Sequence, residues 1–328
     1  MGNWGKRVYR ARVLVALALL GTTLVACSKP AQDATAHTPV KHTSAPCRGA
    51  ATPELAVQNM MQALQSNDLE RIPCLATTPI MATRLELAWR EGRSRWPLTE
   101  LPLSNKLVPV LGALTAPNAD KTLKARFDKS LAGQTNALHQ TARGLGLFAV
   151  RYLQREGDYT TEERAHYAAL IVALGTWAEK APLGDKQIGH DSIDLLVAAA
   201  RESGLRDENG IREAGMRGSL RAMSPLFAAS KDALRKYGLS LDDILGSVTV
   251  SRSDDESDAD HARVHVTYRV AGNSVSTDVN VERRDGLWYT SGLLAAAEKA
   301  INAPQVKIDK PVLVDQNGQP VQAPAAKP

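Results

Sequence analysis

The sequence predicts an α+β protein in which an N-terminal helix and a C-terminal four-stranded antiparallel sheet form one unit. A large all-α insert separates the two along the chain. Apolar residues recur at helical spacing after Thr52 and through most of residues 76–245, whereas apolar and polar residues alternate strictly after Gly246. Because helices repeat every 3.6 residues and half-buried strands every 2, this change of period predicts the change from helix to sheet.

The first helix has a well-marked start. Thr52 can cap it, Pro53 suits the first helical position, and Glu54 lies in the positively polarised first turn. Residues 66–68 (Ser-Asn-Asp) are expected to end it. Its apolar face consists of Val57, Met60, Met61 and Leu64, so we expect an amphipathic helix that packs on another element.

Residues 76–245 predict a helical domain. Thr160 and Glu163 match a capping box, and Asp191 is expected to cap a helix that starts at Ser192. Pro225 is expected to kink the sixth helix or to mark its start. The predicted helices span residues 79–91, 104–114, 119–155 with a break, 161–180, 192–203, 219–237 and 241–245.

Residues 247–302 predict the sheet and a closing helix. Three alternating segments cover residues 247–252, 263–270 and 275–282, with valines or Tyr268 on the apolar side. Gly272-Asn273 and Asp285-Gly286 are expected to form two-residue hairpin turns. A fourth strand is predicted from Leu287, and a closing helix over residues 293–300.

The N-terminus has the parts of an export signal. Four basic residues and no acidic residue precede an apolar run at residues 13–20, which is too short to span a bilayer. Leu24-Val25-Ala26-Cys27 resembles the lipobox of bacterial lipoprotein precursors. The resemblance implies cleavage before Cys27, a diacylglycerol on its sulfur and a third acyl chain on its amine, which together anchor the chain to a membrane. The alternative is an ordinary cleaved signal followed by a chance cysteine.

The charge balance excludes one class of partner. The chain has 40 basic and 35 acidic residues, a formal charge of +5, but Lys6, Arg7, Arg10 and Arg12 leave with the signal peptide. The mature chain would then carry 36 basic and 35 acidic residues. A net charge of +1 gives no reason to expect nucleic acid as a partner. Ser28 follows the cysteine and favours sorting to the outer membrane, on its periplasmic side.

Two cysteines remain after Cys27. Cys47 and Cys74 form an even pair in a chain expected to enter an oxidising compartment, which predicts a disulfide. Such a bond would close a loop of roughly 28 residues and stabilise the fold by on the order of 3–4 kcal/mol. Two free buried thiols are the alternative.

Parts of the chain resemble NTF2-like (cystatin-like) domains. The resemblance rests on Thr-Pro-Glu-Leu-Ala-Val at 52–57, Gln-Ser-Asn-Asp-Leu-Glu at 65–70 and Arg-Asp-Gly-Leu-Trp-Tyr at 284–289. It implies that the first helix lies across a curved sheet, and that Met60, Leu64, Tyr268 and Trp288 line a pocket or interface between them. The long helical insert departs from the family's pattern.

The expected segments are a signal peptide (1–26), a flexible tether (27–50), a split NTF2-like domain (51–75 and 246–302), a helical domain (76–245) and a largely irregular tail (303–328).

Catalytic and metal-binding patterns are weak. His261 and His265 point the same way in a predicted strand and follow an acidic loop at 254–260, so together they could bind a cation. The loop lacks the central Gly and terminal Glu of a calcium loop, which favours a solvated hairpin tip instead. In two predicted helices, acidic residues lie close to a histidine in the sequence. Such residues more often cap a helix than catalyse a reaction. These groups are Glu162, Glu163 and His166, and His190, Asp191 and Asp194. Gly144-Leu145-Gly146 favours helix packing or a break over nucleotide binding.

We therefore expect a lipid-anchored envelope protein that binds a partner protein, for example as a periplasmic immunity or inhibitor protein, or an apolar small ligand. No cofactor and no enzymatic activity are expected. The alternative is a cell-wall hydrolase or another envelope enzyme with its site in the helical domain. Apolar helix stripes are core by default, and a few could line an interaction groove. Core or pocket anchors are expected at Trp89, Trp96, Trp177 and Trp288.

Replacing Cys27 by alanine tests the anchor. Cys27→Ala should abolish palmitate labelling and move the protein out of the membrane fraction, because the acylated sulfur is gone. Metabolic labelling followed by fractionation measures both effects. Labelling equal to that of the unaltered protein would rule out lipidation at this residue.

Overall fold

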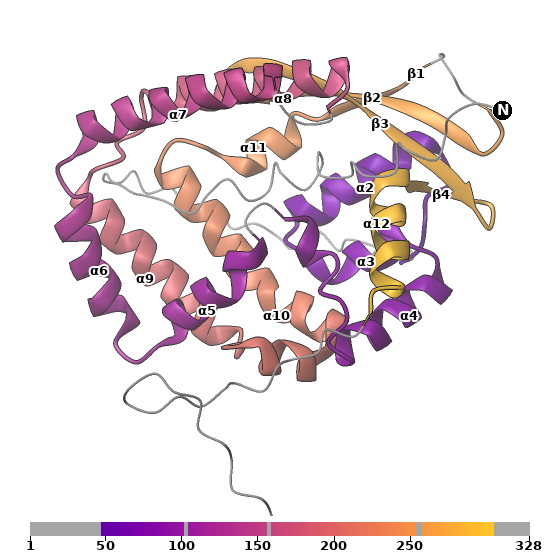
Figure 1. Ribbon diagram of the computed structural model, residues 1–328, viewed down its shortest axis with the longest axis horizontal. Helices are drawn as coiled ribbons and strands as arrows, with labels where there is room; N and C mark the ends of the chain where they lie inside the picture. The colour runs from indigo at the N-terminus through magenta and orange to yellow at the C-terminus, as the bar shows by residue number, and fades with distance from the viewer. Residues whose placement is uncertain (1–46, 102–103, 156–158, 254–257, 305–328) are drawn as a thin grey trace, which may run out of the picture.

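A computed structural model describes residues 47–101, 104–155, 159–253 and 258–304. These residues are mostly helical and include a four-stranded antiparallel sheet near the C-terminus, so the α+β prediction is confirmed (Figure 1). The predicted signal peptide, Cys27 and most of the predicted tail lie outside the described residues. Within the described ranges, none of the helices combines the length and apolarity that a membrane span requires.

The helices follow the predicted order. The first part of the chain contains α2 (Pro53–Gln65), η2 (Leu69–Arg71), α3 (Ile72–Ala76), α4 (Pro79–Arg90), η3 (Leu98–Glu100), η4 (Ser104–Lys106), α5 (Leu107–Thr115) and α6 (Ala119–Ser130). The second part contains α7 (Thr135–Arg155), α8 (Thr161–Ala178), α9 (Lys186–Glu202), α10 (Glu208–Lys236), α11 (Leu241–Gly246) and α12 (Ser291–Ile301). Thr52 caps α2 and the Thr160–Glu163 capping box starts α8, as predicted.

Two predicted helix starts are wrong. The helix predicted from Ser192 begins at Lys186, because Asp185 rather than Asp191 accepts the first backbone N–H groups. The helix predicted from Ser219 begins at Glu208 and passes a kink at Gly215, where φ is +73°. Pro225 therefore lies inside α10 and marks no start.

The sheet has the predicted order and one shifted turn. Strands β1 (Thr249–Ser253), β2 (His261–Val270), β3 (Asn273–Arg284) and β4 (Leu287–Thr290) pair in sequence order. The first hairpin turn is Ala271-Gly272 rather than Gly272-Asn273, since Ala271 and Gly272 have positive φ and Asn273 already pairs with Val270. Asp285-Gly286 forms the second turn as predicted.

One face of the sheet is buried and the other is wet. Val264, Val266 and Tyr268 are at most 1% exposed, while His265 between them is exposed. The first helix, α2, packs against all four strands, and α8, α11 and α12 also pack on the sheet (Figure 1). The predicted packing of the first helix on the sheet is therefore confirmed.

The helical domain and the sheet share a core. Buried residues of α4, α8 and α10 belong to the same apolar cluster as the valines of the sheet. Helix α4 also packs on α12, and α8 on β3. The apolar core is continuous across residues 75 and 245, where the sequence places the domain boundaries. These boundaries stay a prediction.

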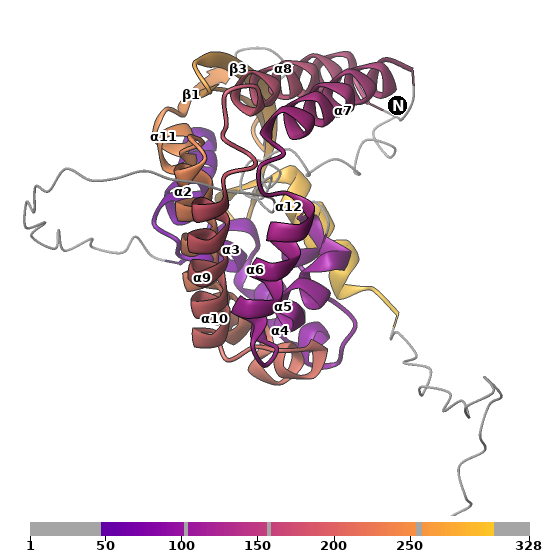
Figure 2. The same cartoon turned by 90° about the vertical axis from the view of Figure 1, so that its left-hand side faces the viewer.

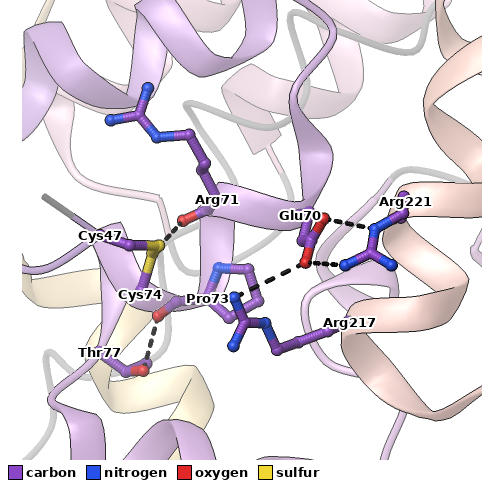
Figure 3. Close-up of a disulfide and its surroundings, with 8 residues drawn as sticks. All are labelled: Cys47, Glu70, Arg71, Pro73, Cys74, Thr77, Arg217 and Arg221. Atoms are coloured by element: carbon purple, nitrogen blue, oxygen red, sulfur yellow. Dashed lines mark hydrogen bonds and ion pairs between the residues drawn. A yellow bond between two sulfur atoms is a disulfide. The ribbon is translucent and has the colours of Figure 1, made fainter. Parts of the chain in front are cut away.

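The N-terminal end of the described chain is fastened at two points. Cys47 and Cys74 are joined in a disulfide, with Cα atoms 5.3 Å apart, as predicted (Figure 3). Ala50 exchanges backbone hydrogen bonds of 3.0 and 2.8 Å with Trp288 of β4. The last residues of the predicted tether, 47–50, are thus held against the fold.

Charged groups of the helical domain bind the N-terminal helices α2 and η2. Glu70 of η2 accepts two hydrogen bonds from the Arg221 guanidinium of α10, at 2.7 and 2.6 Å (Figure 3). Lys231 of α10 is buried; its ammonium group donates to the Gln65 carbonyl at the end of α2, at 2.8 Å, and pairs with Asp242 of α11.

The sheet face gives a matched pair of variants. Val266→Asp should unfold the protein or cost on the order of 4 kcal/mol, because it buries a carboxylate without a partner. His265→Asp, one residue away on the wet face, should cost well under that. Urea unfolding of both variants measures the difference, and equal losses would contradict this assignment of faces.

Candidate functional site

The predicted pocket between the first helix and the sheet is occupied by core side chains. Met60, Leu64, Tyr268 and Trp288 are only 1–7% exposed and belong to the main apolar cluster. Nearby, a gap of about 10 Å³ lies between α8, α10, α11 and β2. That volume is close to one water molecule, so this gap offers no room for a ligand. That the four residues line a ligand pocket stays a prediction.

An apolar cleft lies instead between α7 and α8. The two helices form an antiparallel hairpin, seen side by side in Figure 2. The cleft measures about 260 Å³. Its lining is aromatic and aliphatic: Phe148, Ala149, Tyr152, Leu153, Tyr159, Tyr167 and Ile171.

Helix α8 anchors the cleft to the body. Between Asn273 and Asn280, β3 pairs with β2 alone among the described strands, and α8 lies along it. The His166 ring is buried and donates from Nδ1 to the Ser276 carbonyl, at 2.9 Å. A helix that covers a strand edge in this way satisfies backbone groups that the sheet leaves open.

Helix α7 is held mainly by α8. Its one fully buried side chain among the described residues is Leu153. Hydrogen bonds of 2.9 and 2.7 Å join Arg143 to Glu179 and His139 to the Ala181 carbonyl. These bonds join the N-terminal half of α7 to the end of α8, while the cleft lies at the other half of the hairpin.

Exposed apolar side chains concentrate on this hairpin. Nine large apolar side chains of the described residues are exposed, and five of them lie on α7 and α8: Leu145, Leu147, Phe148, Tyr152 and Val172. Phe148 is 67% exposed and stacks on Tyr152 with ring centres 6.2 Å apart. Leu145, Phe148 and Tyr152 share one face of α7, whereas Leu147 lies on another. Clustered exposed apolar side chains of this kind are typical of an interaction site.

The charges beside the cleft are unequal. Helix α7 contains three arginines and no carboxylate. Arg143 pairs with Glu179, whereas Arg151 and Arg155 make no ion pair within the described ranges. On the α8 side, Glu163 is engaged in the capping box, and the Arg164 guanidinium lies 5.8 Å from the centre of the Tyr159 ring. Positive charge that has no ion pair among the described residues therefore flanks the α7 side.

His166 is buried with one ring nitrogen unpaired. Burial lowers the pKa of His166, and its hydrogen bond to Ser276 opposes this shift in part. Its Nε2 and the nearby Tyr268 hydroxyl have no hydrogen-bond partner among the described residues. Burial at the α8–sheet contact therefore favours the neutral imidazole.

The other predicted acid–imidazole groups do not assemble into a site. His190 pairs with Asp128 of α6 at 2.7 Å rather than with its helix neighbours, and Asp194 pairs with Lys124. His261 and His265 each contact their own carboxylate, Asp258 or Asp278. Within the described ranges, His, Cys, Asp and Glu form no group of three that could hold a metal ion. The Gly144-Leu145-Gly146 segment is continuous helix, so the break that the sequence allowed does not occur. A Cβ at Gly144 would have no neighbour within 4 Å, so close packing is not seen there.

The aromatic anchors are partly as expected. Trp89 and Trp96 are fully buried, and Trp288 packs in the core as predicted. Trp177 is half-buried and donates to the Tyr237 carbonyl at 2.9 Å. The residues that sequence reasoning missed are those of the cleft, above all Leu145, Phe148 and Tyr152. Their signal was that α7 has apolar residues on more than one face.

Comparison with known proteins adds no relative. No family model, curated protein or solved structure matches the chain.

The buried imidazole predicts a pH dependence. Because the folded-state pKa of His166 lies below its ordinary value near 6.5, its contribution to stability is complete above that pH and is lost as the pH falls through it. The urea midpoint should therefore drop between pH 7.5 and pH 5.5. His166→Gln keeps a donor for Ser276 but cannot take up a proton, so its midpoint should drop less. An equal drop in both proteins would contradict this role.

Proposed function

We propose that this chain is a lipid-anchored envelope protein that binds a partner protein through the α7–α8 cleft and has no catalytic activity of its own. The observation that carries the proposal is the concentration of exposed apolar side chains around that cleft. The Leu-Val-Ala-Cys segment supports anchoring at Cys27, and the Cys47–Cys74 disulfide supports an oxidising compartment. A periplasmic inhibitor or immunity protein at the outer membrane is the concrete form of this proposal.

The structure shows an α+β fold, and the relation to one family within that fold class is a proposal. We propose that α2 and the sheet are a split NTF2-like unit whose usual cavity is filled by Met60, Tyr268 and neighbouring core residues. The binding function would then have moved to the helical insert. The packing of α2 across all four strands supports this relation.

Site-specific photocrosslinking in intact cells tests the function. A photoreactive phenylalanine at position 148, in the full-length protein, should give a discrete adduct on irradiation. The control is the same residue at Ile80 of α4, which is 71% exposed but lies outside the cleft. Leu145→Glu should remove the adduct at position 148, since it places a charge in the apolar patch.

Mass spectrometry identifies the adduct. Adducts that form equally at positions 80 and 148, or no adduct at 148, would overturn the assignment of the cleft as the binding face. The Cys27→Ala form should give less adduct, because it loses the local concentration that the membrane anchor provides.

A further inference from the structure

Three of the four exposed apolar residues of α7 form a stripe beside the cleft. Leu145, Phe148 and Tyr152 are spaced i, i+3 and i+7, which places them on one helix face over roughly 10 Å. The neighbouring α8 contributes Tyr167 and Ile171 as the second wall. Two helices with an apolar trough between them match the groove that an amphipathic helix fills with its own apolar face.

The openness of the trough argues against a small ligand. Phe148 and Tyr152 line it, yet they are 67% and 48% exposed, and Leu145 beside them is 63% exposed. Sites for small molecules bury about 70–90% of the ligand surface. A group that covers both the trough and its exposed rim has to be larger, with an apolar face of its own.

The positive charges of α7 indicate which kind of large partner fits the trough. Arg151 and Arg155 lie on the flank of the stripe without ion pairs in the described part of the chain. The α7 helix of a second copy, seated stripe to stripe, has no carboxylate to pair with these arginines and adds like charge to the interface. An occupant with carboxylates along that flank would instead pair with them.

A lipid surface fits less well than a helix. A flat anionic bilayer would meet the whole hairpin face, including Glu162 and Glu163 at the start of α8. A helix about 10 Å wide can seat in the trough and contact the arginine flank alone. Shape and charge therefore favour a helix.

We propose that the α7–α8 cleft binds an amphipathic helix of a partner protein, with carboxylates on the helix flank that faces Arg151 and Arg155. This inference rests on the proposed function, in which the cleft is the binding face. It adds the class of partner and the residues that select it: Phe148 and Tyr152 supply the apolar contact, and the two arginines supply the charge preference.

Two designed peptides test the inference. Both are fluorescein-labelled 18-residue helices with the same leucine stripe, one with glutamates and one with lysines on its flanks. The full-length lipidated protein is held in phosphatidylcholine nanodiscs, and binding is followed by fluorescence anisotropy. The glutamate peptide should bind at least about tenfold more tightly than the lysine peptide, because it pairs with Arg151 and Arg155.

Protein variants provide the matched controls. The double variant Arg151→Glu/Arg155→Glu should reverse the preference, Phe148→Glu should abolish binding of both peptides, and Ile80→Glu should leave it unchanged. Binding of neither peptide, equal binding of both, or a preference that survives the charge reversal would overturn the proposal. So would an adduct at position 148 that consists of lipid or of a second copy of this chain.

The two experiments separate the two claims. A protein adduct at position 148 together with failure of the peptides would leave the binding function standing and remove the acidic-helix assignment. Absence of the adduct would remove the binding function itself.

Discussion

The sheet's apolar face has to be covered, and its main cover comes from the other end of the chain. Val264, Val266 and Tyr268 of β2 are buried, and α2, which packs on all four strands, precedes them by about two hundred residues. Removing this face from water stabilises the fold at roughly 25 cal/mol per Å², whereas the entropy of closing a longer loop grows only logarithmically with its length. A long helical insert between helix and sheet is therefore compatible with their pairing.

The helical insert also helps to position the first helix, because its longest helix, α10, contacts both α2 and α11. Lys231 of α10 is almost fully buried and donates to the last carbonyls of α2 while it pairs with Asp242. A cation at the C-terminal end of a helix binds carbonyl groups that have no helical partner. Removing that ammonium group would take away the hydrogen bond to the Gln65 carbonyl and the ion pair with Asp242, so the insert and the split unit depend on each other.

The sequence predicts what is local and misses what packing selects. Alternation predicts the strands and caps predict α2 and α8, because these signals act within a few residues. The start of α9 was misplaced because Asp185 and Asp191 are both acceptable caps. Packing favours the earlier one, since the added turn brings Gly189 against the Phe127 ring, where a Cβ would lie 2.5 Å from a ring carbon. The cleft was missed because an apolar helix stripe has the same spacing in a core as on a surface.

The candidate binding face depends on one helix, α8, that is fixed to the sheet. Helix α8 is fixed at the β3 edge by the neutral His166 ring and by the burial of Leu170 and Ala173, whereas α7 depends on α8 for most of its contacts. Apolar side chains on α7 therefore remain exposed without weakening the core below. The position of the cleft is set by the helix that lies against the sheet, so the C-terminal strands, which pack on α8 behind the cleft, determine where that face is presented.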